Sequence, residues 1–311
     1  MITVVTLNPA VDKTYRVSAL RPGRIHRVDQ VDAFPGGKGI NVAKVLKRLG
    51  LAVQVTGFIG GGTGDAILQG LDQLGLSHRM VPIPGETRTC LNILDETGRT
   101  QTEFLEPGPS VPKEKWEALK GTVGRLAEES RVVVFSGSLP PGLDDDAYRE
   151  LVFIAQARRS KAVVDTGGAP LARALLARPF AVKPNGAEMA SLFRREEMSD
   201  SERIALLREW NRREIPFACV TLGERGALAS VDGRAHRVFP PEIEAVNPVG
   251  SGDAFTAGLA AGIHREEEIE DILALATAAA ASNALHLQAG EVDEDQVTAL
   301  KEKVRVTLLS R

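Results

Sequence analysis

Short, almost wholly apolar runs alternate with longer amphipathic stretches along nearly the whole chain. The runs are rich in Val, which is typical of strands buried on both faces of a sheet. They span residues 2–7, 52–60, 132–138, 162–165, 180–185 and 217–222. Between them, apolar residues at helical spacing predict helices over 40–49, 64–74, 112–128, 144–158, 186–193, 200–213, 253–264, 269–287 and 293–309. This alternation predicts an α/β fold in which helices cover both faces of a mostly parallel sheet.

Residues 10–33 and 88–106 break this rhythm, because apolar and polar side chains alternate in them. Such alternation predicts strands with one solvated face, and Glu96-Thr97-Gly98 is a hairpin signal between two of them. We therefore predict a small antiparallel sheet, a β lid, over these two segments. The main α/β domain then comprises residues 1–9, 34–87 and 107–311. On pattern alone, surface hairpins without a role explain the two segments equally well.

The composition is that of a soluble globular protein, with 43% hydrophobic and 25% charged residues among 311. The net charge of −3 excludes a strongly basic protein that grips nucleic acid through its phosphates. Two cysteines, Cys90 and Cys219, are too few for a disulfide framework, and we expect both to be core residues. No apolar run approaches the roughly 20 residues of a membrane span. We expect a cytoplasmic protein with no nucleic-acid or membrane partner.

The motif with most chemical content is NPVGSGD (247–253), which precedes an apolar helix. Its glycines permit tight turns, so the amides of Gly250, Ser251 and Gly252 are expected at a helix N-terminus that can bind an anion. A carboxylate at Asp253, beside such a site, suits a base that accepts the proton of a hydroxyl attacking a phosphoryl group. The alternative is an ordinary Asp favoured by the helix dipole.

A second glycine-rich motif, GGKGIN (36–41), opens the helix over 40–49. Gly37 belongs to its turn, Lys38 can place a point charge on a phosphate, and Asn41 can hydrogen-bond a sugar hydroxyl. A simple strand–turn–helix connection is the alternative.

The motif KPNGAE (183–188) follows a predicted strand, at the end of the sheet where α/β proteins bind ligands. Asn185 and Glu188 could orient Mg²⁺ through its waters. Alternatively, Asn185 is a helix N-cap and Glu188 its capping-box partner, and the two interpretations are compatible.

Weaker signals complete the set. TLGERG (221–226) ends a strand in a glycine turn that could meet a nucleotide, or that is a plain turn. Asp12 could bind sugar hydroxyls, and Ser136 ends another strand with a hydroxyl. Arg27 and Arg88, in the predicted lid, could hold a substrate phosphate or be surface charges.

Several common motifs are absent. The sequence has no P-loop signature, which excludes a P-loop NTPase, and no G-x-G-x-x-G, which weakens a dehydrogenase interpretation. The five histidines lack metal-ligand spacing, and no G-x-S-x-G elbow is present.

Taken in order, these motifs resemble those of the ribokinase-like sugar kinases, and within them the phosphofructokinase B branch that acts on phosphosugars. The resemblance covers essentially the whole chain through TLNPAVD (6–12), GGKGINVA (36–43), GETRTC (85–90), SGSLPPG (136–142), VKPNGAE (182–188), LGERGA (222–227) and NPVGSGDAF (247–255). Ser251 departs from the pattern, because the family often carries Ala there.

The resemblance implies an α/β/α sandwich with a β lid, and phosphoryl transfer from MgATP to a phosphosugar hydroxyl, assisted by K⁺ in parts of the family. It implies Asp253 as the base and Gly250, Ser251 and Gly252 as its anion hole. The phosphosugar side would comprise Asp12, Gly37, Lys38, Asn41 and Arg88. The nucleotide and magnesium side would comprise Lys183, Asn185, Glu188, Thr221, Gly223 and Gly226, with Asn283 near the adenine.

The expected activity is therefore that of an ATP-dependent kinase of fructose 1-phosphate, with tagatose 6-phosphate or fructose 6-phosphate as alternative acceptors. Lys38 and Arg88 argue for an acceptor that already carries a phosphate. A sugar-phosphate sensor without catalysis is the alternative from another class, although it has no reason to keep Asp253, Lys38 and Glu188 together. The third hypothesis is a dehydrogenase that uses a nucleotide cofactor. A lid with an exposed edge could pair with a second copy, as a homodimer.

Overall fold

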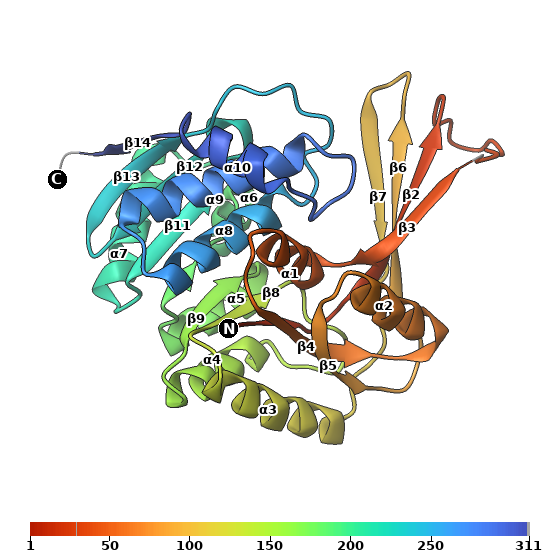
Figure 1. Cartoon of the computed structure of the whole chain (residues 1–311), viewed down its shortest axis with the longest axis horizontal. Coiled ribbons are helices and arrows are strands. Elements are labelled where there is room, and N and C mark those ends of the chain that lie inside the picture. The colour runs from red at the N-terminus through yellow and green to blue at the C-terminus, as the bar shows by residue number, and fades with distance from the viewer. Residues whose placement is uncertain (29, 310–311) are drawn as a thin grey trace.

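The larger of two sheets forms the centre of the molecule. The computed structural model describes residues 1–28 and 30–309. The strands of this sheet are β1 (Ile2–Thr6), β4 (Val53–Ile59), β5 (Ser77–Pro82), β8 (Val132–Ser136), β9 (Lys161–Asp165), β10 (Ala181–Val182), β11 (Phe217–Thr221), β12 (Ala227–Val231), β13 (Arg234–Phe239) and β14 (Arg305–Leu308). Their order is β14-β13-β12-β11-β10-β9-β8-β1-β4-β5 (Figure 1). Neighbours run parallel from β5 to β11, and β12, β13 and β14 continue the sheet antiparallel.

Helices cover both faces of this sheet and build one hydrophobic core on each. One core contains α1 (Lys38–Arg48), α2 (Gly61–Gln73), α8 (Ser251–Arg265), α9 (Ile269–Ala284) and α10 (Glu294–Lys301). The other contains α3 (Lys113–Glu128), α4 (Ala147–Ala157), α5 (Gly168–Ala174), α6 (Gly186–Leu192) and α7 (Asp200–Arg212). The β1 strand serves both, with Ile2 and Val4 in the first core and Val5 in the second. The predicted α/β/α sandwich is confirmed, and it explains why the strands are apolar on both faces.

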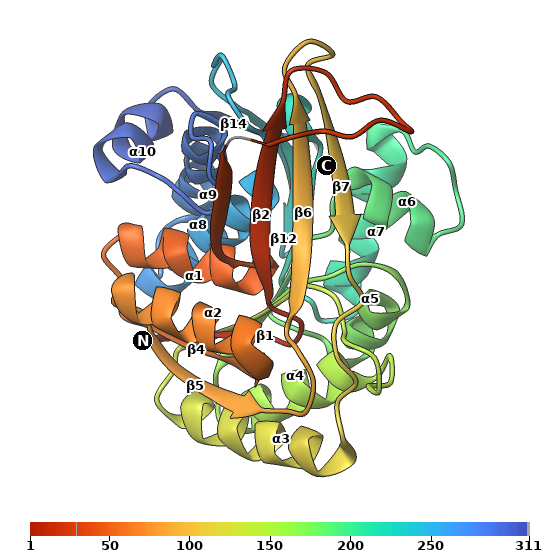
Figure 2. The ribbon, with the colours of Figure 1, turned by 90° about the vertical axis from the view of Figure 1, so that its right-hand side faces the viewer.

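The smaller sheet projects from the main domain (Figures 1 and 2). Its strands are β2 (Ala10–Val17), β3 (Val31–Gly36), β6 (Arg88–Asp95) and β7 (Thr100–Leu105), in the order β3-β2-β6-β7. Both outer pairs are antiparallel, whereas β2 and β6 pair in parallel. The reason is that β2 continues from β1 and β6 from β5, and those two strands run in the same direction in the main sheet. We call this smaller sheet the lid.

The predicted hairpin turn joins β6 to β7, and the Gly98 amide donates to the Asp95 carboxylate at 2.8 Å. Cys219 is buried in the core as predicted. No helix in the described part of the chain is long and apolar enough to span a membrane.

The predicted helix over 293–309 is wrong in its second half. The α10 helix ends at Lys301, and Arg305–Leu308 forms the edge strand β14 paired with β13. Val304, Val306 and Leu308 alternate in the sequence, but pairing with an available edge, rather than local pattern, decides the conformation. The β12–β13 hairpin was also missed, although its turn residues Asp232 and Gly233 are a hairpin signal.

Candidate active site

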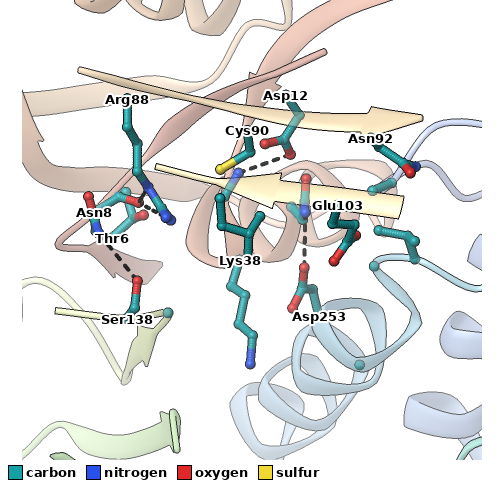
Figure 3. Close-up of a pocket in the computed structure, with 18 of the residues that line it drawn as sticks. Thr6, Asn8, Asp12, Lys38, Arg88, Cys90, Asn92, Glu103, Ser138 and Asp253 are labelled. Carbon is teal, nitrogen blue, oxygen red and sulfur yellow. Dashed lines mark hydrogen bonds between the residues drawn. The ribbon is translucent and has the colours of Figure 1, made fainter. Parts of the chain in front are cut away.

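A cavity of about 1220 Å³ lies between the lid and the main domain. Its floor is formed by the carboxyl ends of β1, β8, β9, β10 and β11, which contribute Thr6, Gly137, Thr166, Lys183 and Thr221. The N-termini of α1 and α8 also open into it, and the lid closes it from the other side (Figure 3). Open α/β sheets bind ligands at this end, so the cavity is the candidate active site.

Asp253 is the third residue of α8 and lies buried at the cavity wall. The turn before it needs a glycine, because Gly250 has a φ of 83°. The Asn41 amide donates to the Asp253 carboxylate at 2.9 Å. Burial raises the pKa of Asp253 to about 7, even though the nearby Lys38 ammonium lowers it. A carboxylate with this pKa can accept a proton near neutral pH.

The glycine turn presents only part of the predicted anion hole. The Ser251 amide donates to the Pro248 carbonyl at 3.2 Å, and Ser251 does not line the cavity. Gly250 and Gly252 do line it, and within residues 1–28 and 30–309 their amides have no hydrogen-bond acceptor. Two amides at the positive end of α8 therefore remain for an anionic ligand.

Asn283 holds this turn from behind instead of facing the cavity. It is fully buried, donates to the Val249 carbonyl at 2.8 Å and accepts from the Gly290 amide at 2.8 Å. Asn283 does not line the cavity, and its expected place near an adenine stays a prediction. The side-chain amide of Asn283 instead hydrogen-bonds the two backbone segments that it joins, at Val249 and at Gly290.

Lys38 belongs to a charge network whose centre, Asp165, is buried, whereas the Lys38 side chain itself is partly exposed. Its Nζ lies 3.0 Å from Glu188 Oε1 and 3.9 Å from Asp165 Oδ1, and Asp165 raises the pKa of Lys38 most strongly. Asp165 also pairs with Lys183 at 3.3 Å and accepts from the Thr256 hydroxyl at 2.6 Å. Burial alone would raise the pKa of Asp165, but Lys183 and Lys38 hold it below its usual value. Sequence reasoning missed Asp165, whose only signal is its place at the end of a buried strand.

Asn185 and Glu188 form the capping box of α6. The Glu188 amide donates to Asn185 Oδ1 at 2.7 Å, and the Asn185 amide donates to Glu188 Oε2 at 2.8 Å. Both residues also line the cavity, so the capping interpretation is confirmed and is compatible with a role toward a ligand. No three His, Cys, Asp or Glu side chains gather into a metal cage in the described residues.

Asp12 and Arg88 lie at the lid side of the cavity (Figure 3). Asp12 accepts from the Gly37 amide at 3.2 Å, so a carboxylate of the protein already occupies part of the N-terminus of α1. Arg88 donates through Nε and Nη2 to the Asn8 carbonyl and through Nη1 to the Glu106 carbonyl. Among residues 1–28 and 30–309, two of its five N–H groups have no acceptor and remain for a ligand.

Most of the predicted site residues come together in this cavity. They are Asp12, Gly37, Lys38, Asn41, Arg88, Lys183, Asn185, Glu188, Thr221, Gly250, Gly252 and Asp253.

Four other predicted residues do not line the cavity. Ser136 is fully buried at the end of β8, and the following Gly137 and Ser138 line the cavity in its place. Gly226 is a packing glycine, because a Cβ there would lie 2.1 Å from the Val238 carbonyl oxygen. Gly223 begins the 3₁₀ helix Gly223–Arg225 outside the cavity lining. Arg27 is exposed between β2 and β3, not within a lid strand as predicted.

The lid contributes residues that sequence reasoning missed. Alternation along its strands directs Cys90, Asn92 and Glu103 into the cavity, so Cys90 is not a core residue (Figure 3). Gln101, near the tip, donates to Asn247 at 3.0 Å, and Asn247 Oδ1 also accepts from the Val249 amide at 3.0 Å. The lid therefore contacts the glycine turn directly.

Comparisons with known proteins identify the family. The sequence profile of the pfkB family carbohydrate kinases matches residues 5–296. Tagatose-6-phosphate kinase of Staphylococcus epidermidis is 34% identical over 309 residues, covering 98% of this chain and 99% of that protein.

Solved structures of similar fold were also found. Phosphofructokinase-2 from Escherichia coli, in complex with potassium, has a TM-score of 0.91 at 26% identity and covers 97% of this chain and 98% of its own. A possible 1-phosphofructokinase from Thermotoga maritima shares the fold, with a TM-score of 0.90 at 24% identity over 99% of both chains. The dehydrogenase alternative is thereby excluded. The chain belongs to the pfkB family of carbohydrate kinases and is a phosphotransferase that acts on a sugar hydroxyl.

Proposed function

We propose that this kinase transfers the γ-phosphoryl group of ATP to a hydroxyl of a ketohexose phosphate, with fructose 1-phosphate as the first candidate acceptor. The observation that carries the proposal is the meeting of Asp253, the free amides of Gly250 and Gly252, and Lys38 in one lidded cavity. Tagatose 6-phosphate is the second candidate, because the Staphylococcus epidermidis relative bears that name. Fructose 6-phosphate is the third.

In this proposal the acceptor hydroxyl loses its proton to Asp253 while its oxygen bonds to the γ-phosphorus. The bond from that phosphorus to the bridging oxygen of ADP breaks at the same time. The amides of Gly250 and Gly252 and the ammonium of Lys38 stabilise charge on the transferring group. Asn41 orients the base through its hydrogen bond to Asp253. The lid excludes water, which otherwise competes as acceptor.

The donor side would be formed by Lys183, Thr221 and the backbone near Asn185, which line the cavity. Mg²⁺ fits the oxygen donors present, because Glu188 faces the cavity and this ion keeps several of its waters. When bound, Mg²⁺ would neutralise charge on the ATP phosphates. The potassium complex of the Escherichia coli neighbour is the reason to include K⁺ in assays.

The acceptor phosphate is assigned to Arg88 together with Ser138. Lys38 is already paired with Glu188, whereas Arg88 retains two N–H donors at the cavity wall. Ser138 lies nearby, because the Asn8 side chain donates to its hydroxyl at 3.3 Å. Asp12 and Asn41 remain for the sugar hydroxyls, and Asn41 Oδ1 has no hydrogen-bond partner among the described residues.

We also propose a cytoplasmic location, where ATP and phosphosugars are found, and a homodimer formed through the lid. Phe104 and Val31 are exposed on the lid. Phe104 alternates with Glu103 and Leu105, which line the cavity, so it points away from the cavity. An apolar outer face on an open sheet favours pairing with a second copy.

The test is ADP release with MgATP and K⁺ over fructose 1-phosphate, tagatose 6-phosphate, fructose 6-phosphate, fructose and ribose, ranked by kcat/KM. A phosphosugar should lead the neutral sugars by at least about tenfold, or about 1.4 kcal/mol of transition-state preference. The acceptor with the highest kcat/KM identifies the specificity of the enzyme.

A leading neutral sugar would contradict the phosphate role of Arg88. Binding of phosphosugars without turnover would support the sensor alternative instead. Asp253→Asn is the control, because it should bind acceptor while losing turnover.

A further inference from the structure

Asn8 is a buried side chain of the cavity to which no role has yet been given. It lies between the end of β1 and the start of β2, where the chain passes from the main sheet into the lid. Only 7% of the residue is exposed, although it lines the cavity. Buried amide groups are hydrogen-bonded, so the partners of Asn8 indicate what this residue does.

Both N–H groups of the Asn8 side chain have acceptors within the protein. One donates to the Pro107 carbonyl at 3.1 Å, where the chain returns from β7 toward the main domain. The other donates to the Ser138 hydroxyl at 3.3 Å, just past the end of β8 (Figure 3). A side-chain amide nitrogen carries two hydrogens, so none remains for a ligand. Asn8 therefore acts on a ligand through its neighbours.

The bond from Asn8 determines how the Ser138 hydroxyl can be used. A hydroxyl has one donor hydrogen and two acceptor lone pairs, and the Asn8 amide occupies one lone pair. Within residues 1–28 and 30–309 this hydroxyl has no other hydrogen bond, and Ser138 lines the cavity. Its own hydrogen is therefore available to an acceptor in the cavity, such as a phosphate oxygen.

The backbone of Asn8 holds the other group of the proposed phosphate site. Its carbonyl accepts from Arg88 Nε at 3.1 Å and from Arg88 Nη2 at 2.9 Å. Pro9 follows, and a residue before proline is restricted to extended conformations, so this carbonyl has little freedom of direction. One residue thus holds Arg88 by its main chain and Ser138 by its side chain.

Gly108 leaves the room that the Asn8 amide occupies. A Cβ at Gly108 would lie 2.4 Å from Asn8 Oδ1, and its φ of 87° also favours glycine. The amide oxygen therefore packs against bare backbone, while the amide nitrogen keeps its two bonds to Pro107 and Ser138.

We propose that Asn8 is a positioning residue of the acceptor-phosphate site, which orients the Ser138 hydroxyl to donate to the phosphate beside the Arg88 guanidinium. This inference rests on the proposed function, in which Arg88 and Ser138 bind that phosphate. It goes beyond that function, because it makes a residue outside the phosphate contacts responsible for their geometry.

The first experiment is a double-mutant cycle with Asn8→Ala, Ser138→Ala and the double variant. We measure kcat and both KM values with the ketohexose phosphate that the wild type prefers. Each single variant should raise the acceptor KM about tenfold, and the MgATP KM should change less than about twofold. The double variant should match Ser138→Ala within about twofold, because Asn8 acts through that hydroxyl. Single effects that multiply in the double variant, or an equal rise in both KM values, overturn the proposal.

A second variant moves the Asn8 amide without removing it. Gly108→Ala places a methyl group against Asn8 Oδ1 and should raise the acceptor KM at least about fivefold. Gly233→Ala, in the β12–β13 hairpin, is the matched control, because Gly233 has a φ of 83° but no atom within 4 Å of an added Cβ. It carries similar backbone strain and should change neither KM. An acceptor KM that is the same in Gly108→Ala and Gly233→Ala would contradict the role of Asn8.

A third readout does not depend on turnover. Titration calorimetry gives the Kd of fructose 1-phosphate, tagatose 6-phosphate and fructose 6-phosphate for the variants of the cycle, and the Kd of the tightest ligand should follow the same pattern as the acceptor KM. Binding with this pattern but without turnover contradicts only the proposed function. Turnover with independent effects of Asn8 and Ser138 contradicts only the positioning role. If none of the three phosphosugars binds to the wild type, both proposals are overturned.

Discussion

Asp253 and Lys44 are buried beside the same cavity, and burial moves their pKa values in opposite directions. The pKa of Asp253 rises to about 7 and that of Lys44 falls to about 8. In both cases a low-dielectric environment disfavours the charged form. Burial therefore makes both groups easier to neutralise near neutral pH than the same groups in water. A proton acceptor with a pKa near the working pH combines availability with driving force.

Asp253→Asn should lower kcat by about 10²–10⁴-fold, the usual contribution of a positioned base. In the wild type, kcat/KM should fall below about pH 7, because the protonated carboxyl cannot accept the hydroxyl proton. The measurement is steady-state ADP release against pH.

Asn41→Ala should move this acid limb to higher pH. The Asn41 amide stabilises the ionised carboxylate of Asp253, so its removal raises the pKa further. Asn92→Ala, which removes a cavity amide that has no hydrogen bond to Asp253, should leave the limb in place. An acid limb that is the same in Asn41→Ala and the wild type would contradict the role given to Asn41.

At the scale of elements, a hydrogen bond between β7 and the segment before α8 joins the lid to the glycine turn of the proposed site. Asn247 accepts from both Gln101 and the Val249 amide, and it donates to the Leu287 carbonyl at 2.7 Å. The lid therefore bonds to the residue that, through the Val249 amide and the Leu287 carbonyl, holds the segment before Gly250. The Asn247 side chain therefore links the lid to the turn that carries the proposed anion site.

Gln101→Ala should weaken closure by about 0.5–1.5 kcal/mol, the net value of one hydrogen bond. We expect an acceptor KM about 2–10-fold higher, and more ATP hydrolysis per sugar phosphorylated, because water enters an open site. The acceptor KM and the ratio of hydrolysis to transfer are both measured by parallel assays of ADP and of phosphorylated sugar. Thr100→Ala, an exposed neighbour on the same strand, is the matched control. An unchanged ratio of hydrolysis to transfer in Gln101→Ala would show that the bond does not govern closure.

At the scale of the whole molecule, the lid has two faces of different character. One face closes the cavity, and the other carries exposed apolar side chains such as Phe104, which is 58% exposed. A small sheet that leaves apolar surface in water is stabilised when a second sheet covers it. Assembly and catalysis would then share one element.

Phe104→Asp should therefore weaken self-association at least about tenfold, because a charge cannot be buried in an apolar interface without a partner. Sedimentation velocity at micromolar concentrations measures this. Glu96→Gln, in the hairpin turn, is the matched lid control. A wild-type chain that sediments as a monomer throughout would contradict the dimer.

The sequence by itself determined the layers of the fold, because strands buried on both faces must be apolar throughout. It also determined Asp253, the glycine turns and the α6 capping box, because these depend on neighbours only a few residues away. Only the tertiary structure decided the parallel pairing of β2 with β6, the edge strand β14, the inward position of Asn283 and the network around Asp165. Lys44 belongs with these, because burial lowers its pKa while Asp12, Glu291 and Asp253, which come from distant parts of the chain, raise it. Electrostatic environment and strand pairing depend on which groups become neighbours in space, and no local pattern records that.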